Sequence, residues 1–212
     1  MNSWNLFKLV SKMSTIRLGF IGLTATPGAW ANNAHLPYLS QSPHYKIVAL
    51  ANSSVGAAEA AIKAHSLSPD TKAYGSPADL AADPDVDMVV VSVNVARHYE
   101  LIKPALEAGK MAYVEWPLGN NTAEAEELAQ LAKAKNLKTV VGLQGRQTDV
   151  ARVLKEIVDS KRLGEVLSSH VDASAGSFDT QVPAKYKYFI DPKVGGNFFT
   201  IPFGHCGFPS RQ

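Results

Sequence analysis

The sequence is poor in cysteine, and its apolar runs are short. Its one cysteine, Cys206, cannot form a disulfide within the chain, which excludes a disulfide-stapled fold and suits a reducing compartment. The longest apolar run, near 88–93, is far shorter than the roughly 20 residues that span a bilayer, so we expect no membrane anchor. The histidines are scattered without the spacing of metal ligands, and we therefore predict no metal site.

A large charge of either sign is also missing. The 21 basic and 19 acidic residues leave a net charge of +2, which gives no electrostatic basis for direct nucleic-acid binding. Acidic residues do not occur before Glu59, so the amino-terminal quarter is mildly basic. This segment either packs through its small and apolar residues or presents a positive field to an anionic ligand.

Apolar runs alternate with helical segments along the first two thirds of the chain. We expect strands, most of them continuously apolar as in a sheet covered on both faces, over 16–22, 46–51, 72–75, 87–93, 111–115 and 138–143. We expect helices over 55–67, 76–83, 95–109 and 121–136. Repeated strand–helix–strand units predict an α/β fold with a doubly wound, Rossmann-like parallel sheet.

The pattern changes after about residue 147. The segment 148–166 is expected to form one amphipathic helix that stops at Gly164. A half-buried strand is expected over 165–174, and aromatic loops are expected over 175–205. The part of the chain after residue 147 is too short to complete a domain of its own. We therefore expect three parts: a disordered extension over 1–13, a first domain over 14–146 and an incomplete second domain over 147–212.

A glycine-containing loop follows the first expected strand, in the segment GFIGLTATPGAW (19–30). Gly22 suits the first glycine of a dinucleotide-binding turn, but Thr24 takes the place of the second, and Gly28 lies past the position of the third, so the loop is longer than standard. The hydroxyls of Thr24 and Thr26 are candidate donors to phosphate oxygens, and a helix is expected from about 29. From these residues alone, a structural turn and a nucleotide site are about equally supported.

The end of the second expected strand has no acidic residue. An acid at this place usually binds the ribose hydroxyls of NAD, but here the chain reads Asn52, Ser53, Ser54. Nothing at this position repels the 2′-phosphate of NADP, and no arginine is placed to bind it. The choice between NAD and NADP therefore stays open.

The segment VSVNVARHYELIKPALEAGKMAYVEWPLG (91–119) resembles the glucose–fructose oxidoreductase / inositol dehydrogenase / MocA family. The resemblance depends on the spacing of Asn94, His98, Gly109 and the triplet 115–117. It extends over about 14–205. It implies a dinucleotide-binding domain over 14–146, followed by the start of an α+β domain with an open antiparallel sheet.

Within this family, the chain most resembles the branch of the fungal galactose-pathway repressors. The shared features are the lengthened first loop ending in tryptophan, the VEW triplet, LQGR (143–146) and TIPFGH (200–205). The resemblance implies NAD or NADP as the ligand. The residues that it assigns to nucleotide binding are Gly22, Leu23, Thr24, Ala25, Ser53, Val93, Asn94, His98, Glu115, Trp116 and Gln144.

Two residues depart from the pattern of the active enzymes in this family. Those enzymes carry a lysine in a Glu–Lys–Pro triplet, where this chain has Trp116, and an acid four residues before a catalytic histidine, where it has Ile201. Only His205 matches the expected catalytic set. Tryptophan has no titratable nitrogen near neutral pH, so Trp116 cannot act as a general base, although it could stack on a nicotinamide ring.

These departures leave three hypotheses. The first is a catalytically impaired regulator in the cytoplasm or nucleus, which senses NAD or NADP and binds a transcription activator, with a homodimer left open. The second is an NAD(P)-dependent oxidoreductase that acts on a sugar or polyol. The third is a truncated, inactive member of the family.

Overall fold

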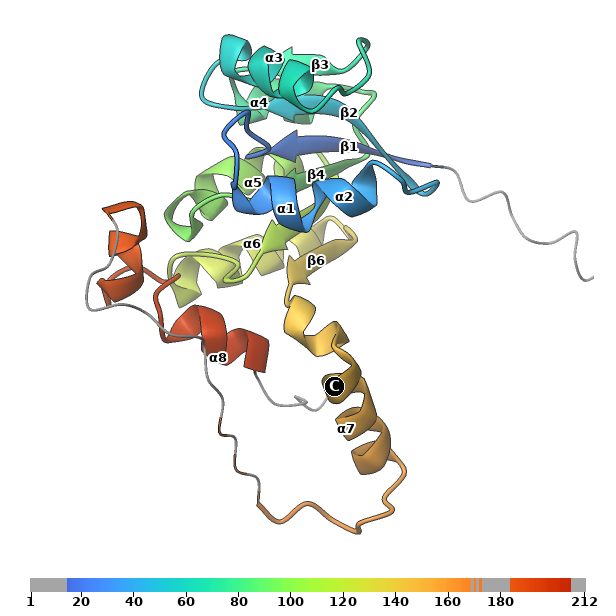
Figure 1. Ribbon diagram of the computed structural model, residues 1–212, viewed down its shortest axis with the longest axis vertical. Coiled ribbons are helices and arrows are strands. Elements are labelled where there is room, and N and C mark those ends of the chain that lie inside the picture. The colour runs from blue at the N-terminus through green and yellow to red at the C-terminus, as the bar shows by residue number, and fades with distance from the viewer. Residues whose placement is uncertain (1–14, 169, 171, 173–183, 207–212) are drawn as a thin grey trace, which may run out of the picture. The chain divides into compact units, whose positions relative to one another are not determined.

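The computed structural model describes residues 15–168, 170, 172 and 184–206, whose elements are shown in Figure 1. The chain divides into two compact units. The first unit contains the described residues up to Val93, together with Glu100–Tyr113 and Leu131–Thr139. The second contains Asn94–Tyr99, Val114–Gln130 and the described residues from Val140 onward. The expected extension over 1–13 lies outside the described residues.

Six strands form one sheet in the order β3-β2-β1-β4-β5-β6. Their bounds are β1 (Ile16–Ile21), β2 (Tyr45–Ala51), β3 (Lys72–Tyr74), β4 (Met88–Val91), β5 (Met111–Glu115) and β6 (Thr139–Gly142). β1 pairs in parallel with both β2 and β4, and β2 pairs in parallel with β3. The six strands expected between residues 16 and 143 are all present, and the Rossmann-like parallel sheet is confirmed.

Helices connect the strands, as the alternation of the sequence predicts. Up to residue 142 they are α1 (Trp30–Ala34), α2 (Leu36–Leu39), α3 (Val55–Ala64), α4 (Pro77–Ala82), the 3₁₀ helix η3 (Val95–Arg97), α5 (His98–Glu107) and α6 (Thr122–Ala134). α4 shows the local reason for such boundaries. The Ser76 hydroxyl accepts hydrogen bonds from the backbone N–H groups of Ala78 and Asp79, and Pro77 supplies a preset first helical residue.

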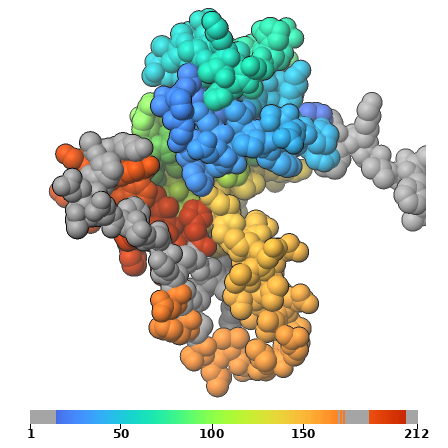
Figure 2. Space-filling model, in the orientation of Figure 1, coloured from blue at the N-terminus to red at the C-terminus, as the bar shows by residue number. Residues whose placement is uncertain are grey.

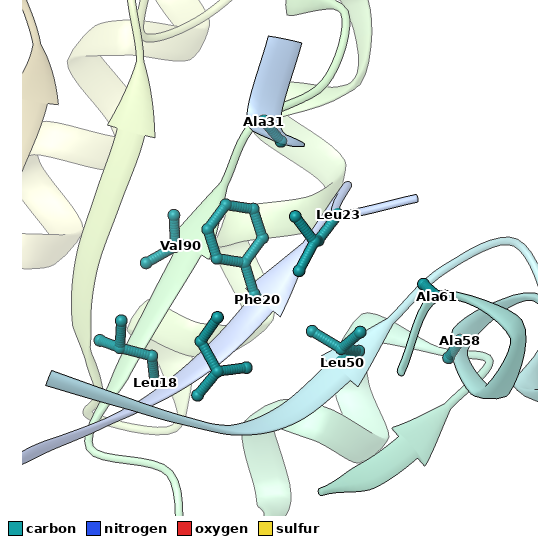
Figure 3. Packing of buried hydrophobic residues seen from close by; sticks show 9 residues of the cluster. Leu18, Phe20, Leu23, Ala31, Leu50, Ala58, Ala61 and Val90 are labelled. Carbon is teal, nitrogen blue, oxygen red and sulfur yellow. The ribbon is translucent and has the colours of Figure 1, made fainter. Parts of the chain in front are cut away.

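The hydrophobic core of the first unit surrounds β1, as Figure 3 shows. Phe20, near the carboxyl end of this strand, is fully buried. The cluster consists of Leu18, Phe20, Leu23, Ala31, Ile47, Leu50, Ala58, Ala61 and Val90. Leu23 lies just beyond β1, so the first residues of the glycine loop are anchored in the core.

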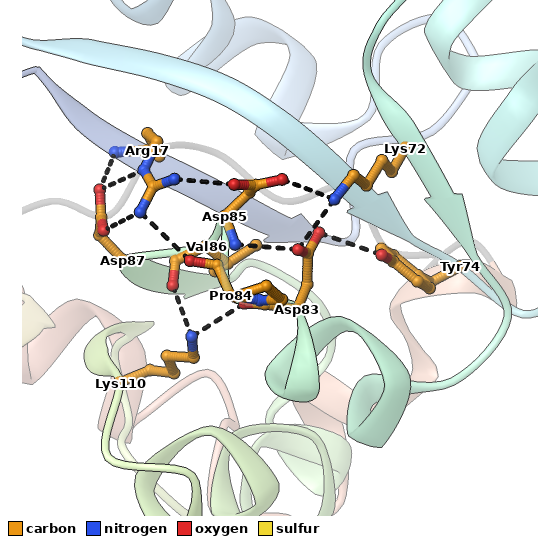
Figure 4. Close-up of polar contacts among 9 residues, drawn as sticks. All are labelled: Arg17, Lys72, Tyr74, Asp83, Pro84, Asp85, Val86, Asp87 and Lys110. Atoms are coloured by element: carbon orange, nitrogen blue, oxygen red, sulfur yellow. Dashed lines mark hydrogen bonds and ion pairs between the residues drawn. The ribbon is translucent and has the colours of Figure 1, made fainter.

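A network of charged side chains lies at the amino-terminal edge of the sheet, opposite the end at which the glycine loop leaves β1 (Figure 4). Arg17 forms ion pairs with Asp87 at 2.8 Å and with Asp85 at 3.0 Å. Lys72 pairs with Asp85 at 2.8 Å and with Asp83 at 2.9 Å. The network therefore links the first residues of β1 and β3 to the segment that precedes β4.

Asp83 is the buried member of this network. It accepts hydrogen bonds from the Tyr74 hydroxyl and from the backbone N–H of Asp85. The Lys110 ammonium donates to the backbone carbonyls of Asp83 and Val86, each at 2.8 Å. Burial alone would raise the pKa of Asp83, but its hydrogen bonds to Asp85, Lys72 and Tyr74 outweigh burial and hold the pKa below its ordinary value.

We expect the stabilisation that this network contributes to the fold to be lost in acid. The hydrogen bond from Arg17 also holds the pKa of Asp87 below its ordinary value. The unfolded chain therefore binds more protons than the folded chain once the pH falls below about 4. The free energy of unfolding decreases as the pH falls further, through the folded-state pKa values of Asp83 and Asp87. Urea unfolding over a pH series measures this slope. Asp87→Asn should reduce it and the exposed Asp70→Asn should not; equal slopes in both variants would contradict the assignment.

The second unit carries the helical elements of the chain beyond residue 143. They are the 3₁₀ helix η4 (Gln144–Gln147), α7 (Asp149–Asp159), the 3₁₀ helix η5 (Ala184–Ile190) and α8 (Thr200–Cys206). The Thr148 hydroxyl caps α7 by accepting from the backbone N–H of Ala151. The side chains of Val150, Val153 and Leu154 on α7 are exposed. Figure 2 shows the surface of this helix in yellow and orange.

The sequence misplaces three features of this unit. The helix expected over 148–166 ends at Asp159, because Lys161 adopts a left-handed backbone with φ of 53° that cannot continue it. The half-buried strand expected over 165–174 is wrong for residues 165–168, which are exposed and outside any strand. The aromatic loop expected over 175–205 contains η5 and α8 in its described part. The antiparallel sheet expected after residue 147 stays a prediction.

Candidate functional site

The glycine loop of the first unit begins with a tight turn at Gly22. Gly22 has a φ of 103°, a backbone conformation that side chains disfavour. A Cβ atom at this position would overlap the carbonyl oxygen of Ser92, the residue that follows β4. Only glycine lets β1 and β4 approach at this edge, which is the first role of glycine in a dinucleotide-binding turn.

The carbonyl oxygens of the loop are bound by side chains. The Asn32 amide donates to the carbonyls of Thr24 at 2.9 Å and Thr26 at 3.0 Å. The Asn52 amide donates to the Leu23 carbonyl at 2.9 Å. Carbonyl oxygens repel a phosphate, so directing them at protein donors makes the loop compatible with the pyrophosphate of a dinucleotide. This arrangement and the turn at Gly22 fit an NAD(P) ligand.

A third side chain, His65, also binds the loop. Its Nε2 atom lies 2.7 Å from the Thr24 carbonyl oxygen. Because that oxygen only accepts, His65 Nε2 is the donor. We refer to Asn32, Asn52 and His65 as the loop clamp. In sequence, Asn52 stands out only as a missing acid, and His65 carries no signal, since it lies 41 residues from Thr24.

The other residues assigned to the ligand in the first unit lie near the ends of the strands. Leu23 is fully buried in the core and can contribute only its backbone, whereas Ala25 is exposed. Ser53 follows β2 and is exposed. Val93 lies beside the turn, since its Cγ1 atom would be 2.6 Å from a Cβ atom at Gly22.

In the second unit, Asn94 and His98 organise the segment that follows β4. The Asn94 side chain caps η3 by accepting from the backbone N–H of Ala96 at 3.0 Å. His98 is 1% exposed, and its Nδ1 atom lies 2.7 Å from the Pro117 carbonyl oxygen. Asn94 is exposed and accessible to a ligand, whereas His98 has a structural contact of its own.

Trp116 packs against α8. Its indole N–H donates to the Thr200 carbonyl at 2.9 Å. A Cβ atom at Gly204 would overlap the indole ring, so this glycine permits close contact between the helix and the ring. The contact commits the only hydrogen-bond donor of the Trp116 side chain to the protein, and this side chain supplies neither a proton nor a charge to a substrate.

His205, also on α8, is the residue of the second unit best suited to acid–base chemistry. Its Nδ1 atom is buried without a hydrogen-bond partner among the described residues. Burial lowers the pKa of His205, and the nearby Glu115 carboxylate opposes this only partly. The imidazole is therefore mostly neutral near pH 7. Glu115, the last residue of β5, is 7% exposed, and Gln144, at the start of η4, is exposed.

Comparison with known proteins identifies two matching segments. Residues 16–143 match the family described as "Oxidoreductase family, NAD-binding Rossmann fold". Residues 150–207 match the family described as "Gal80p, C-terminal domain". The family resemblance inferred from the sequence is confirmed.

The curated relatives include both an enzyme and a regulator. The chain is 42% identical over 193 residues to dehydrogenase aclE of Aspergillus oryzae, with 90% of this chain and 52% of the relative covered. It is 31% identical over 204 residues to the galactose/lactose metabolism regulatory protein GAL80 of Saccharomyces cerevisiae, with 92% and 46% covered. The chain thus spans about half the length of these curated relatives.

The matching solved structures likewise include a regulator and an enzyme. A super-repressor mutant of Gal80p from Saccharomyces cerevisiae matches with a TM-score of 0.80 and 30% identity, covering 91% of this chain and 50% of that one. Myo-inositol dehydrogenase from Lactobacillus casei, in complex with NAD(H) and myo-inositol, matches with a TM-score of 0.63 and 29% identity, covering 71% and 43%. The extent of the first family match, together with the sheet order and the turn at Gly22, shows that this chain belongs to the oxidoreductase family with an NAD-binding Rossmann fold.

Proposed function

We propose that this chain is a nucleotide-binding regulator of the Gal80 type, which binds NAD or NADP and acts through contact with a transcription activator in the cytoplasm or nucleus. The observation that carries the proposal is the position and the hydrogen bond of the Trp116 side chain. It occupies the place of the lysine of active family members, and its N–H is already donated to Thr200. With Ile201 in the place of the usual acid as well, His205 lacks both the lysine and the acid that accompany the histidine in the active enzymes.

The proposed nucleotide site uses the backbone of the glycine loop. Gly22, Leu23, Thr24 and Ala25 would hold the pyrophosphate, Ser53 would lie near the adenosine ribose, and Val93 would line the turn. The family resemblance assigns Asn94, His98, Glu115, Trp116 and Gln144 to the nicotinamide half. α1 has only five residues, so the proposed site relies on the turn, whose shape the loop clamp holds, and not on the helix. When bound, the nicotinamide supplies a hydride acceptor or donor.

NAD and NADP are both compatible with this site. Ser54 caps α3 by accepting from the backbone N–H of Ala57, and the Asn52 amide is directed at the Leu23 carbonyl. Only the exposed Ser53 hydroxyl offers a polar side chain at the end of β2. A neutral hydroxyl neither repels the 2′-phosphate of NADP nor provides the two acceptors with which an acid binds the ribose of NAD.

A dehydrogenase acting on a sugar or polyol is the second candidate. It is favoured by the half-buried, mostly neutral imidazole of His205 near Glu115, whose buried Nδ1 atom could accept a proton. The identity of 42% to a dehydrogenase supports it as well. In this function, His205 would be the catalytic residue.

Turnover assays separate the two functions. We expect the protein to bind NADH or NADPH yet to reduce neither NAD⁺ nor NADP⁺ with any member of a panel of sugars and polyols, as followed by nicotinamide absorbance. Substrate-dependent reduction that His205→Ala abolishes would establish the dehydrogenase instead. For the regulator, affinity purification from the source cells should recover a transcription activator, and its absence would contradict that role.

A further inference from the structure

The loop clamp attaches the carbonyl side of the glycine loop to three separate elements. Asn32 lies on α1, Asn52 directly follows β2, and His65 directly follows α3. The Thr24 carbonyl accepts from two of them, Asn32 at 2.9 Å and His65 at 2.7 Å. Thr24 is thus the point at which the loop is held most firmly to the rest of the first unit.

His65 differs from Asn32, the other donor to the Thr24 carbonyl, in its distance along the chain. Asn32 lies eight residues from Thr24, on the short helix that follows the loop in the chain, whereas His65 lies 41 residues away, directly after α3. α3 packs against β2 and β3, and the backbone N–H of His65 donates to the Ala61 carbonyl. The imidazole therefore connects the loop to a helix that is fixed independently.

The direction of this hydrogen bond sets which groups of the loop face a ligand. A peptide unit carries its carbonyl and its N–H on opposite sides. When His65 holds the Thr24 carbonyl toward α3, the N–H of the same peptide unit, that of Ala25, points the other way. The hydroxyl of Thr24 reinforces this shape by accepting from the backbone N–H of Thr26 at 3.3 Å.

We propose that His65 is a positioning residue for nucleotide binding, which holds the Thr24–Ala25 peptide so that its N–H is presented to the pyrophosphate without touching the nucleotide itself. This inference rests on the proposed nucleotide site. It explains how a loop with threonine in place of the second glycine keeps an anion-binding shape, because a side-chain hydrogen bond supplies the restraint. Loss of this bond leaves the loop to pay the cost of ordering when the ligand binds.

Three substitutions at position 65 test the role. Glutamine can place its amide nitrogen near the position of His65 Nε2, asparagine is too short to do so, and alanine removes the donor. We expect dissociation constants for NADH and NADPH, measured by titration calorimetry, to rise roughly five- to tenfold in His65→Ala and His65→Asn, and to stay near wild type in His65→Gln. The matched control is His44→Ala, since His44 is exposed and lies before β2, and it should bind like wild type.

Amide hydrogen exchange of residues 22–28 without nucleotide gives a readout that does not depend on binding. Exchange should be faster in His65→Ala than in wild type or His65→Gln. If His65→Ala does not fold, the comparison of His65→Gln with His65→Asn decides. Equal affinity in the glutamine and asparagine variants, or unchanged loop exchange in both, would overturn the positioning role. A wild-type protein that binds neither NADH nor NADPH would overturn the proposed function as well, so the two failures are distinguishable.

Discussion

Gly22→Ala is expected to lower the free energy of unfolding by about 3 kcal/mol and to abolish nucleotide binding. The left-handed backbone alone costs an alanine about 1–2 kcal/mol. The new methyl group would also overlap the Ser92 carbonyl, a backbone atom that cannot rotate away, which adds a cost of the kind seen for overpacking, about 1–3 kcal/mol. Urea unfolding and NADH titration measure the two effects.

Gly28→Ala is the matched control for this prediction. Gly28 also has a positive φ, of 75°, but a Cβ atom there would meet no heavy atom within 4 Å. Its substitution should therefore cost only the conformational part, about 1–2 kcal/mol. If both variants lost the same stability, the contact between Gly22 and Ser92 would not constrain the turn.

Phe20→Ala is expected to destabilise the protein by about 3–5 kcal/mol, since it removes the largest fully buried side chain among the described residues from β1, at the core. Phe20 lies among Leu18, Leu23 and Val90 in Figure 3, and its ring centroid is 5.9 Å from that of His35. The cavity would lie directly beneath the strand that carries the glycine loop.

Phe20→Leu serves as the control, because leucine keeps most of the apolar volume and should cost less than about 1.5 kcal/mol. Chemical unfolding monitored by circular dichroism measures both variants. A loss of less than about 1 kcal/mol in Phe20→Ala would show that β1 is not the centre of the core.

The strands of this fold could be predicted from sequence because each is a short apolar run with a helical segment after it. The run at 88–93 predicts a strand buried on both faces, and β4 (Met88–Val91) has three buried valines. In the same way, Ser76 and Pro77 predict the start of α4, since capping depends only on neighbouring residues. Local chemistry determines these features, so a single sequence reveals them.

The features that failed depend on distant partners. Alternation over 165–174 suggests a strand, but a strand also needs a neighbour to pair with, and Leu167 is 93% exposed. The hydrogen bond from Trp116 to Thr200 spans 84 residues and gives Trp116 a packing role that its position in the triplet does not reveal. The contact of His65 with Thr24 is likewise invisible in the sequence, because only the fold brings the two together.

The most direct test of the account is a thermal melt of the full chain with and without NAD and NADP. A ligand at a hundred times its Kd stabilises the folded state by about 2.7 kcal/mol, which corresponds to a rise in Tm of roughly 5–10 °C for a protein of this size. We predict one cooperative transition that at least one of the two nucleotides raises by this amount, and that Gly22→Ala removes the shift. A cooperative transition that neither nucleotide moves would contradict the account and leave GFIGLTATPGAW as a structural loop.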